Sequence, residues 1–398
     1  MSVPTTNLYD FVHQVLENQF LIKYFYPWGC KEIENIINGP FLVPEKVVKI
    51  AESLFVDPND NRKCSVSPVV LCHDQEPLDF DYYKDSFLKL GLKNMSKWHS
   101  SMNNLNLRWC HPGSLVTHWV LLHSELNSDQ VQQYEDTGLF KCAYWWSHAM
   151  ISRDWYRFAE HDQRLLESHN KIANWLVYAH GVTGKREYRK GFLKQLKNIN
   201  NVQLGSINTD AVVNSNSSAE YNFEDFTKTN CSIVLETVYD GRIHLTEKTL
   251  RPIACGHPFI ILNGSGTLNY LRSYGFKTFH PFIDESYDLE TDSNKRMSMV
   301  LSEMDRINKL SNIEQERIWK ACAVITKHNK NLFFSDCFFK ALKQELYNNI
   351  VKIPKTNLNF NVLENRYQLS ADTMNQKQWL SLYWHLKKGN HYDNWYTN

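Results

Sequence analysis

The sequence of 398 residues lacks the features of several large protein classes. No apolar run approaches the length that spans a bilayer, and the first residues lack the basic and apolar segments of a signal peptide. The nine cysteines are scattered, odd in number and without a C-x-x-C pair, which argues against a disulfide framework and against a zinc site. We therefore expect a soluble, cytoplasmic protein that has no membrane partner.

A strong net charge and the spacing of a metal site are missing as well. Lys and Arg total 44 against 43 Asp and Glu, so the formal net charge is +1. A protein that holds duplex DNA by overall charge is normally more basic, although a local basic groove would be compatible with this balance. The 16 histidines form no H-E-x-x-H or H-x-H pattern, so we expect no metal ion.

The sequence does contain alternating strand-like and helix-like segments. Short apolar runs predict buried strands at 68–72, 116–123, 174–180, 231–236 and 258–262. Helical patterns occupy 185–197 and 246–254, and helices predominate from about residue 296 onward. Alternation around two separate centres predicts an α/β protein with two Rossmann-like lobes that face a central cleft, followed by a helical C-terminal segment.

A chain of this length normally forms more than one domain. We expect an N-terminal lobe over 1–167, a second lobe over 168–345 and a tail over 346–398 that packs back on the lobes. The second lobe begins near 168 because a strand, a glycine-containing loop and a helix then follow in the order that opens a βαβ unit.

The densest group of chemically functional residues surrounds the sequence HLTEK at 244–248. Thr246 suits an N-cap, and a helix that starts there would direct free N–H groups and its positive dipole end towards an anion. Lys248 adds a mobile charge suited to a diphosphate, and Glu247 could accept hydrogen bonds from sugar hydroxyls. Taken alone, the triplet is more typical of a capped surface helix with an exposed Glu-Lys pair.

The sequence around this motif resembles the donor-binding segment of the α-1,3-fucosyltransferase-like glycosyltransferases. That segment reads F-E-N, a short gap, Y-V-T-E-K, a helix, and then G-x-x-P before a strand, and residues 233–262 follow this order. Glu236 matches the first acid, and T-E-K is matched by Thr246, Glu247 and Lys248. His244 stands where the family usually has tyrosine. The resemblance implies the two-lobed GT-B architecture and a donor site made by these five residues.

Two further segments carry the resemblance. Residues 174–188 are similar to the strand, loop and arginine segment of the family, which implies that Arg186 pairs with the donor phosphates. Residues 69–80 are similar to the segment with the catalytic acid, which implies that Glu76 is the general base, with Asp74 as the reserve. The nucleotide sugar is then a co-substrate, and no metal or other cofactor is implied.

The sequences of these segments are most similar to those of family members encoded by large tailed phages. Phage enzymes of this kind can modify the DNA of the phage. The resemblance therefore favours inverting transfer of arabinose or a hexose to hydroxymethylated pyrimidines, with duplex DNA as the partner and the host cytoplasm as the location. The high aromatic content of 13% is compatible with holding a flipped base. Two alternatives stay open: a glycan-directed fucosyltransferase-like enzyme and a non-catalytic nucleotide-binding protein.

Overall fold

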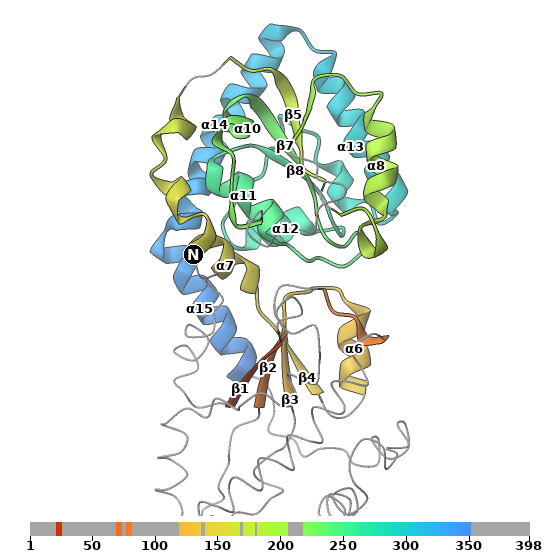
Figure 1. Cartoon of the computed structure of the whole chain (residues 1–398), viewed down its shortest axis with the longest axis vertical. Helices are drawn as coiled ribbons and strands as arrows, with labels where there is room; N and C mark the ends of the chain where they lie inside the picture. Colours follow the sequence, from red (N-terminus) through yellow and green to blue (C-terminus); the bar gives the residue numbers. More distant parts are fainter. Residues whose placement is uncertain are drawn as a thin grey trace, which may run out of the picture. The chain divides into compact units, whose positions relative to one another are not determined.

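A computed structural model describes most of the middle of the chain (Figure 1). The described residues are 21–25, 69–73, 77–81, 119–136, 140–167, 170–179, 181–205 and 218–351. They form an α/β protein with two parallel four-stranded sheets. Contacts divide the chain into two compact units, each of which contains one sheet.

The first sheet has the strand order β1-β2-β3-β4. Its strands are β1 (Leu21–Phe25), β2 (Val69–His73), β3 (Trp119–His123) and β4 (Phe140–Tyr144). The predicted strands at 68–72 and 116–123 are confirmed where the structure describes them, whereas β1 and β4 were not predicted. Helix α6 (Asp129–Asp136) packs on β4 through the fully buried Tyr134.

The second sheet has the order β6-β5-β7-β8. Its strands are β5 (Ala173–Val177), β6 (Val202–Leu204), β7 (Thr229–Leu235) and β8 (Phe259–Leu262). The predicted strands at 174–180, 231–236 and 258–262 are confirmed to within a few residues. Their side chains are almost entirely buried, as expected for parallel strands covered on both faces. The short strand β6 is half-exposed and was not predicted.

Helices cover both faces of this second sheet, which is consistent with a Rossmann-like fold. Figure 1 shows α8 (Tyr188–Leu196) and α13 (Ser293–Asn308) on one side of the sheet. On the other side lie α10 (Phe223–Thr227), α11 (Glu247–Cys255) and α14 (Asn312–Phe334). The helix predicted at 246–254 is therefore confirmed, and so is the predominance of helix over residues 296–351.

Three further α-helices lie in the described residues. Helix α12 (Thr267–Ser273) follows β8, and α15 (Asp336–Val351) follows α14. Helix α7 (Ser147–Trp155) packs on α11. Its Arg153 donates hydrogen bonds to three carbonyl oxygens at the end of α14, those of Phe333, Phe334 and Ser335. Arg153 thereby pairs carbonyl groups that the helix leaves unsatisfied at its C-terminus.

The left-handed backbone conformation at the end of α11 can be tested by mutation. Gly256 has a φ of +70° and ends the helix in the left-handed conformation, so Gly256→Ala should destabilise the protein by about 1 kcal/mol. The added Cβ would lie 3.5 Å from Lys330 Cδ, which is an ordinary contact, so the cost is conformational. Chemical denaturation measures the change in the free energy of unfolding.

Gly191 provides the matched control, because it lies within α8 and a Cβ there would meet no atom within 4 Å. Gly191→Ala should stabilise the protein by about 0.5–1 kcal/mol, since alanine loses less backbone entropy on folding. Equal effects of the two substitutions would contradict the left-handed end of α11.

Candidate anion-binding site

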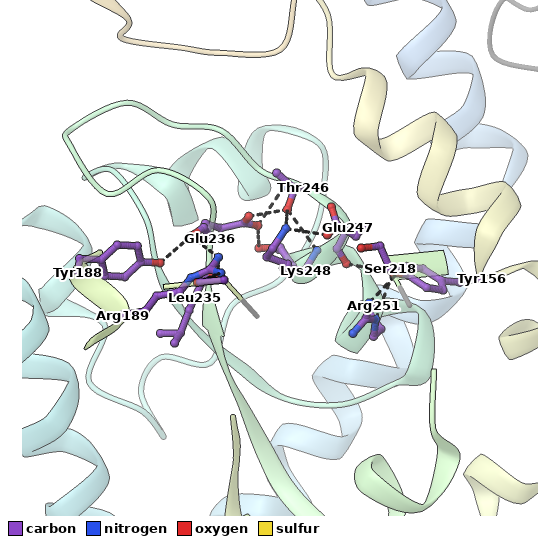
Figure 2. A network of polar contacts seen from close by, with 12 residues as sticks. Tyr156, Tyr188, Arg189, Ser218, Leu235, Glu236, Thr246, Glu247, Lys248 and Arg251 are labelled. Atoms are coloured by element: carbon purple, nitrogen blue, oxygen red, sulfur yellow. Dashed lines mark hydrogen bonds and ion pairs between the residues drawn. The ribbon is translucent and has the colours of Figure 1, made fainter. Parts of the chain in front are cut away.

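The loop between β7 and α11 carries most of the predicted site residues (Figure 2). Strand β7 ends at Leu235, and α11 starts at Glu247 with Thr246 as its N-cap. Glu236 is the first residue after the strand, and its side chain reaches across the loop to the start of the helix. In this way the carboxyl end of a parallel strand and the amino end of a helix meet at one edge of the sheet.

Glu236 holds the start of α11 in place. Its side chain is fully buried, and its carboxylate accepts hydrogen bonds from three donors. Oε1 accepts from Thr246 N at 3.0 Å and from Thr249 Oγ1 at 2.7 Å. Oε2 accepts from Thr246 Oγ1 at 2.6 Å. A buried carboxylate requires such partners, so this predicted donor-binding residue is turned towards the helix.

Residues of α8 bind the backbone carbonyl groups at Glu236 and at the residue before it. Tyr188 donates its hydroxyl to Glu236 O at 2.6 Å, and burial raises the pKa of that phenol. Arg189 is 1% exposed and donates to Leu235 O at 2.7 Å and to Glu236 O at 2.9 Å. Its other terminal nitrogen donates to Gly181 O at 3.1 Å. Arg189 therefore joins the loop after β5 to the end of β7, a role that the sequence did not indicate.

Arg186, the arginine that the resemblance singled out, lies at the same edge. It ends the short 3-10 helix η3 (Gly184–Arg186) and is half-buried. Gly181 has a φ of +63°, and a Cβ on it would lie 3.4 Å from Arg186 Cδ. The arginine side chain thus crosses the loop after β5 at a glycine, and it is close enough to Tyr188 to oppose the rise in the pKa of that phenol.

The first turn of α11 carries the ammonium group of Lys248. Thr246 Oγ1 accepts from Lys248 N at 3.3 Å, which forms the N-cap. Lys248 Nζ donates to Glu247 Oε1 at 2.6 Å and to Thr246 Oγ1 at 3.3 Å. The Lys248 side chain is 26% exposed. The amide of Glu247 has no hydrogen-bond partner within the described part of the chain. Lys248 and this amide are the groups that an anion could contact.

Glu247 stays ionised beside this lysine. Burial alone would raise the pKa of its carboxyl group, but the Lys248 ammonium, His148 and Arg251 together hold that pKa well below its usual range. Figure 2 shows how the network continues along α11, where Arg251 Nε donates to Tyr156 Oη at 3.2 Å. The Tyr156 hydroxyl in turn donates to Ser218 O at 2.6 Å. The ionised Glu247 can accept hydrogen bonds from hydroxyl groups.

His244 has no exposed surface. Its Nδ1 lies 3.3 Å from both the Oγ and the carbonyl oxygen of Ser124. The ring of His148 in α7 meets the His244 ring edge to face, with centroids 5.0 Å apart. In this conformation the face of the His244 imidazole is covered by protein, and the ring packs the loop against α7.

A buried ion pair fixes the middle of the loop. Arg242 NH1 lies 3.2 Å from each carboxylate oxygen of Glu125, and its Nε donates to Asp240 Oδ1 at 2.9 Å. Burial lowers the pKa of the Arg242 guanidinium, but the two carboxylates outweigh that effect and raise it. Backbone hydrogen bonds of 2.9 and 3.0 Å join Leu126 to Ile243 next to this pair. Sequence analysis missed the pair because its partners are 117 residues apart.

The two predicted catalytic acids are not among the described residues. Glu76 and Asp74 lie outside the described residues, between the end of β2 at His73 and Pro77. Among the predicted site residues that are described, the structure brings Glu236, Thr246, Glu247 and Lys248 together at the start of α11. His244 lies on the same loop, and Arg186 lies at the carboxyl edge of the same sheet.

No family model matches the sequence, and no similar chain is found among curated proteins or solved structures. None of the helices in the described ranges combines the length and the apolar composition that crossing a membrane requires. Across the same ranges, no group of three or more His, Cys, Asp or Glu side chains is arranged to hold a metal ion.

The role of Glu236 can be tested by stability. Glu236→Gln places an amide NH₂ group among three donors, so at least one donor loses its partner. We expect the free energy of unfolding to fall by about 2 kcal/mol or more, because buried groups without partners are costly. Glu224→Gln is the control, since the Glu224 side chain is 51% exposed and pairs with Lys228 on the surface. That change should cost less than about 0.5 kcal/mol. Similar losses for both variants would contradict the assigned role.

Proposed function

We propose that this protein is a glycosyltransferase that uses a nucleotide-sugar donor and binds the donor diphosphate at the start of α11. The observation that carries the proposal is the first turn of this helix, where the Lys248 ammonium bonds to Thr246 Oγ1 and to the Glu247 carboxylate. The Glu247 amide in the same turn has no acceptor among the described residues. Helix N-termini attract anions through their N–H groups and their dipole. Ligands of open parallel sheets bind at the carboxyl ends of the strands, which is where this turn lies.

Each residue at this edge has a distinct part in the proposal. Lys248 and Arg186 neutralise the diphosphate as the sugar leaves, so no metal ion is required. Glu247 accepts hydrogen bonds from hydroxyl groups of the donor. Glu236 and Thr246 position the helix end, and His244 packs the loop that leads to it.

The catalytic step requires a base from the other unit. In this proposal the two units are the two lobes of a GT-B enzyme, and Glu76 follows the carboxyl end of β2. Its carboxylate takes the proton of the acceptor hydroxyl while that oxygen forms a bond to C1 of the sugar. The bond between C1 and the diphosphate breaks on the opposite face, so the configuration at C1 is inverted. Asp74 is the second candidate for the base.

The favoured acceptor is a hydroxymethylated pyrimidine in phage DNA, and the transferred sugar is arabinose or a hexose. Four exposed lysines support contact with a phosphate backbone: Lys185 on η3, Lys190 and Lys194 on α8, and Lys197 at the C-cap of α8. Binding to duplex DNA that weakens steeply with salt distinguishes this acceptor from a surface glycan. A non-catalytic nucleotide-binding protein is the alternative in which Glu76 has no chemical role.

The donor site is tested by removing its cation. A thermal-shift screen against nucleoside diphosphates and their sugars first identifies the nucleotide, because a ligand of the folded state raises the melting temperature. Lys248→Met should then weaken binding of that nucleotide by at least about tenfold, since it removes a charge-assisted contact. Lys190→Met removes an equal charge from the exposed surface of α8 and should leave the affinity unchanged. Calorimetric titration measures both; unaltered affinity of the Lys248 variant would refute the site.

The catalytic base is tested separately from donor binding. Glu76→Gln should keep the affinity for the donor and lower the rate of transfer by roughly 10²–10⁴-fold, which is the usual contribution of a general base. Asp74→Asn serves as the control and should retain most of the activity. If the Glu76 variant transfers sugar at the normal rate, the base is another residue. Donor binding without transfer by the unmodified protein to any hydroxylated acceptor would favour the non-catalytic alternative.

A further inference from the structure

A cavity lies at the opposite edge of the second sheet, where the strands begin. Its volume is about 600 Å³, which is within the range of small-molecule sites. Lys171 lies just before β5, Asn230 lies at the start of β7, and Pro258 lies just before β8. The cavity is therefore separated from the start of α11 by the length of the sheet.

One face of α14 forms a wall of this cavity. The lining residues of the helix include Asn312, Gln315, Trp319, Ala323 and Thr326, which follow one another at intervals of three or four. This spacing puts them on one face of the helix. The Trp319 ring packs edge to face on Trp175, with centroids 5.8 Å apart. The Trp319 indole, Phe226 and Pro258 supply apolar groups to the lining of the cavity.

Lys171 supplies a charge that no carboxylate neutralises within the described residues. Its Nζ donates to Thr229 O at 2.7 Å, which leaves two of its three hydrogens for other acceptors. Desolvation lowers the pKa of this ammonium group. The other lining lysine, Lys320, is paired with Glu316 at 2.7 Å. The first turn of α14 adds the positive end of a helix dipole to the same wall.

His257 adds no charge to the cavity. Burial lowers the pKa of its imidazole to about 3, so the ring is neutral at physiological pH. Its Nε2 lies 3.1 Å from Thr229 O and therefore carries the hydrogen, because a carbonyl oxygen only accepts. Its Nδ1 then accepts from Ser232 Oγ at 2.9 Å. Both ring nitrogens are used within the protein, so His257 offers no charge to a ligand.

We propose that this cavity binds a small aromatic monocarboxylate, with the carboxylate on Lys171 Nζ and the ring against Trp319 and Phe226. A single negative charge fits better than a phosphate dianion, because Glu167 and Glu316 also line the cavity and repel additional charge. The proposal is independent of the glycosyltransferase function, since no lining residue belongs to the site at the start of α11.

Benzoate is the probe, and benzamide is its neutral counterpart of the same shape. Titration of the full chain, followed by calorimetry and by ligand-observed NMR, should show saturable benzoate binding with a Kd of about 1 mM or lower. Benzamide should bind at least about tenfold more weakly, because it lacks the charge that Lys171 pairs with. Absence of saturable benzoate binding to the unmodified protein would overturn the proposal.

Variants then locate the binding site. Lys171→Met should weaken benzoate binding at least about tenfold and leave benzamide binding unchanged. Lys327→Met, which removes a charge from the exposed surface of α14 outside the cavity, should change neither. Ala323→Trp should abolish binding of both probes by filling the cavity, with the melting temperature showing that the variant is folded. Equal benzoate affinity in the Lys171 and Lys327 variants would refute the site, as would competition between benzoate and a nucleoside diphosphate.

Discussion

The geometry of the candidate site depends on one buried carboxylate. Glu236 is fully buried, and its three hydrogen bonds with Thr246 and Thr249 join the end of β7 to the start of α11. Tyr188 and Arg189 bind the carbonyl side of the same residue. A buried charge held this way is costly to disturb, so the amino end of α11 has a fixed place relative to the sheet edge. A fixed helix end is what a preorganised anion site requires.

The other interactions around the loop between β7 and α11 also hold the start of α11 in place. The Glu125–Arg242 pair holds the middle of the loop, and the capped first turn holds Lys248 beside Glu247. Helix α11 also joins the two edges of the sheet, because it begins at this turn and ends at Cys255, which lines the cavity together with Gly256. The two proposed sites therefore lie at opposite ends of one helix.

Local signals explain what could be predicted from the sequence. The apolar runs of β5, β7 and β8 and the N-cap Thr246 are readable because each depends on neighbouring residues. Strand β6 is too short and too exposed to show such a run. The role of Glu236 follows from the fold of a loop, and the partners of Arg189 and Arg242 are distant in sequence. Arg186 and Arg189 lie one helical turn apart, so the sequence alone could not tell which would be buried. The bases predicted at Glu76 and Asp74 stay predictions.

The central claim is that the start of α11 binds the diphosphate of a nucleotide. Hydrogen–deuterium exchange of the backbone amides, followed by mass spectrometry with and without saturating nucleoside diphosphate, tests it most directly, because a bound anion protects the amides that it contacts. We expect slower exchange in peptides that cover the first turn of α11, near Glu247 and Lys248, and no change in peptides that cover the end of the helix near Gly256. Saturable binding that leaves exchange in the first turn unaltered, or that protects only the opposite edge of the sheet, would contradict the account.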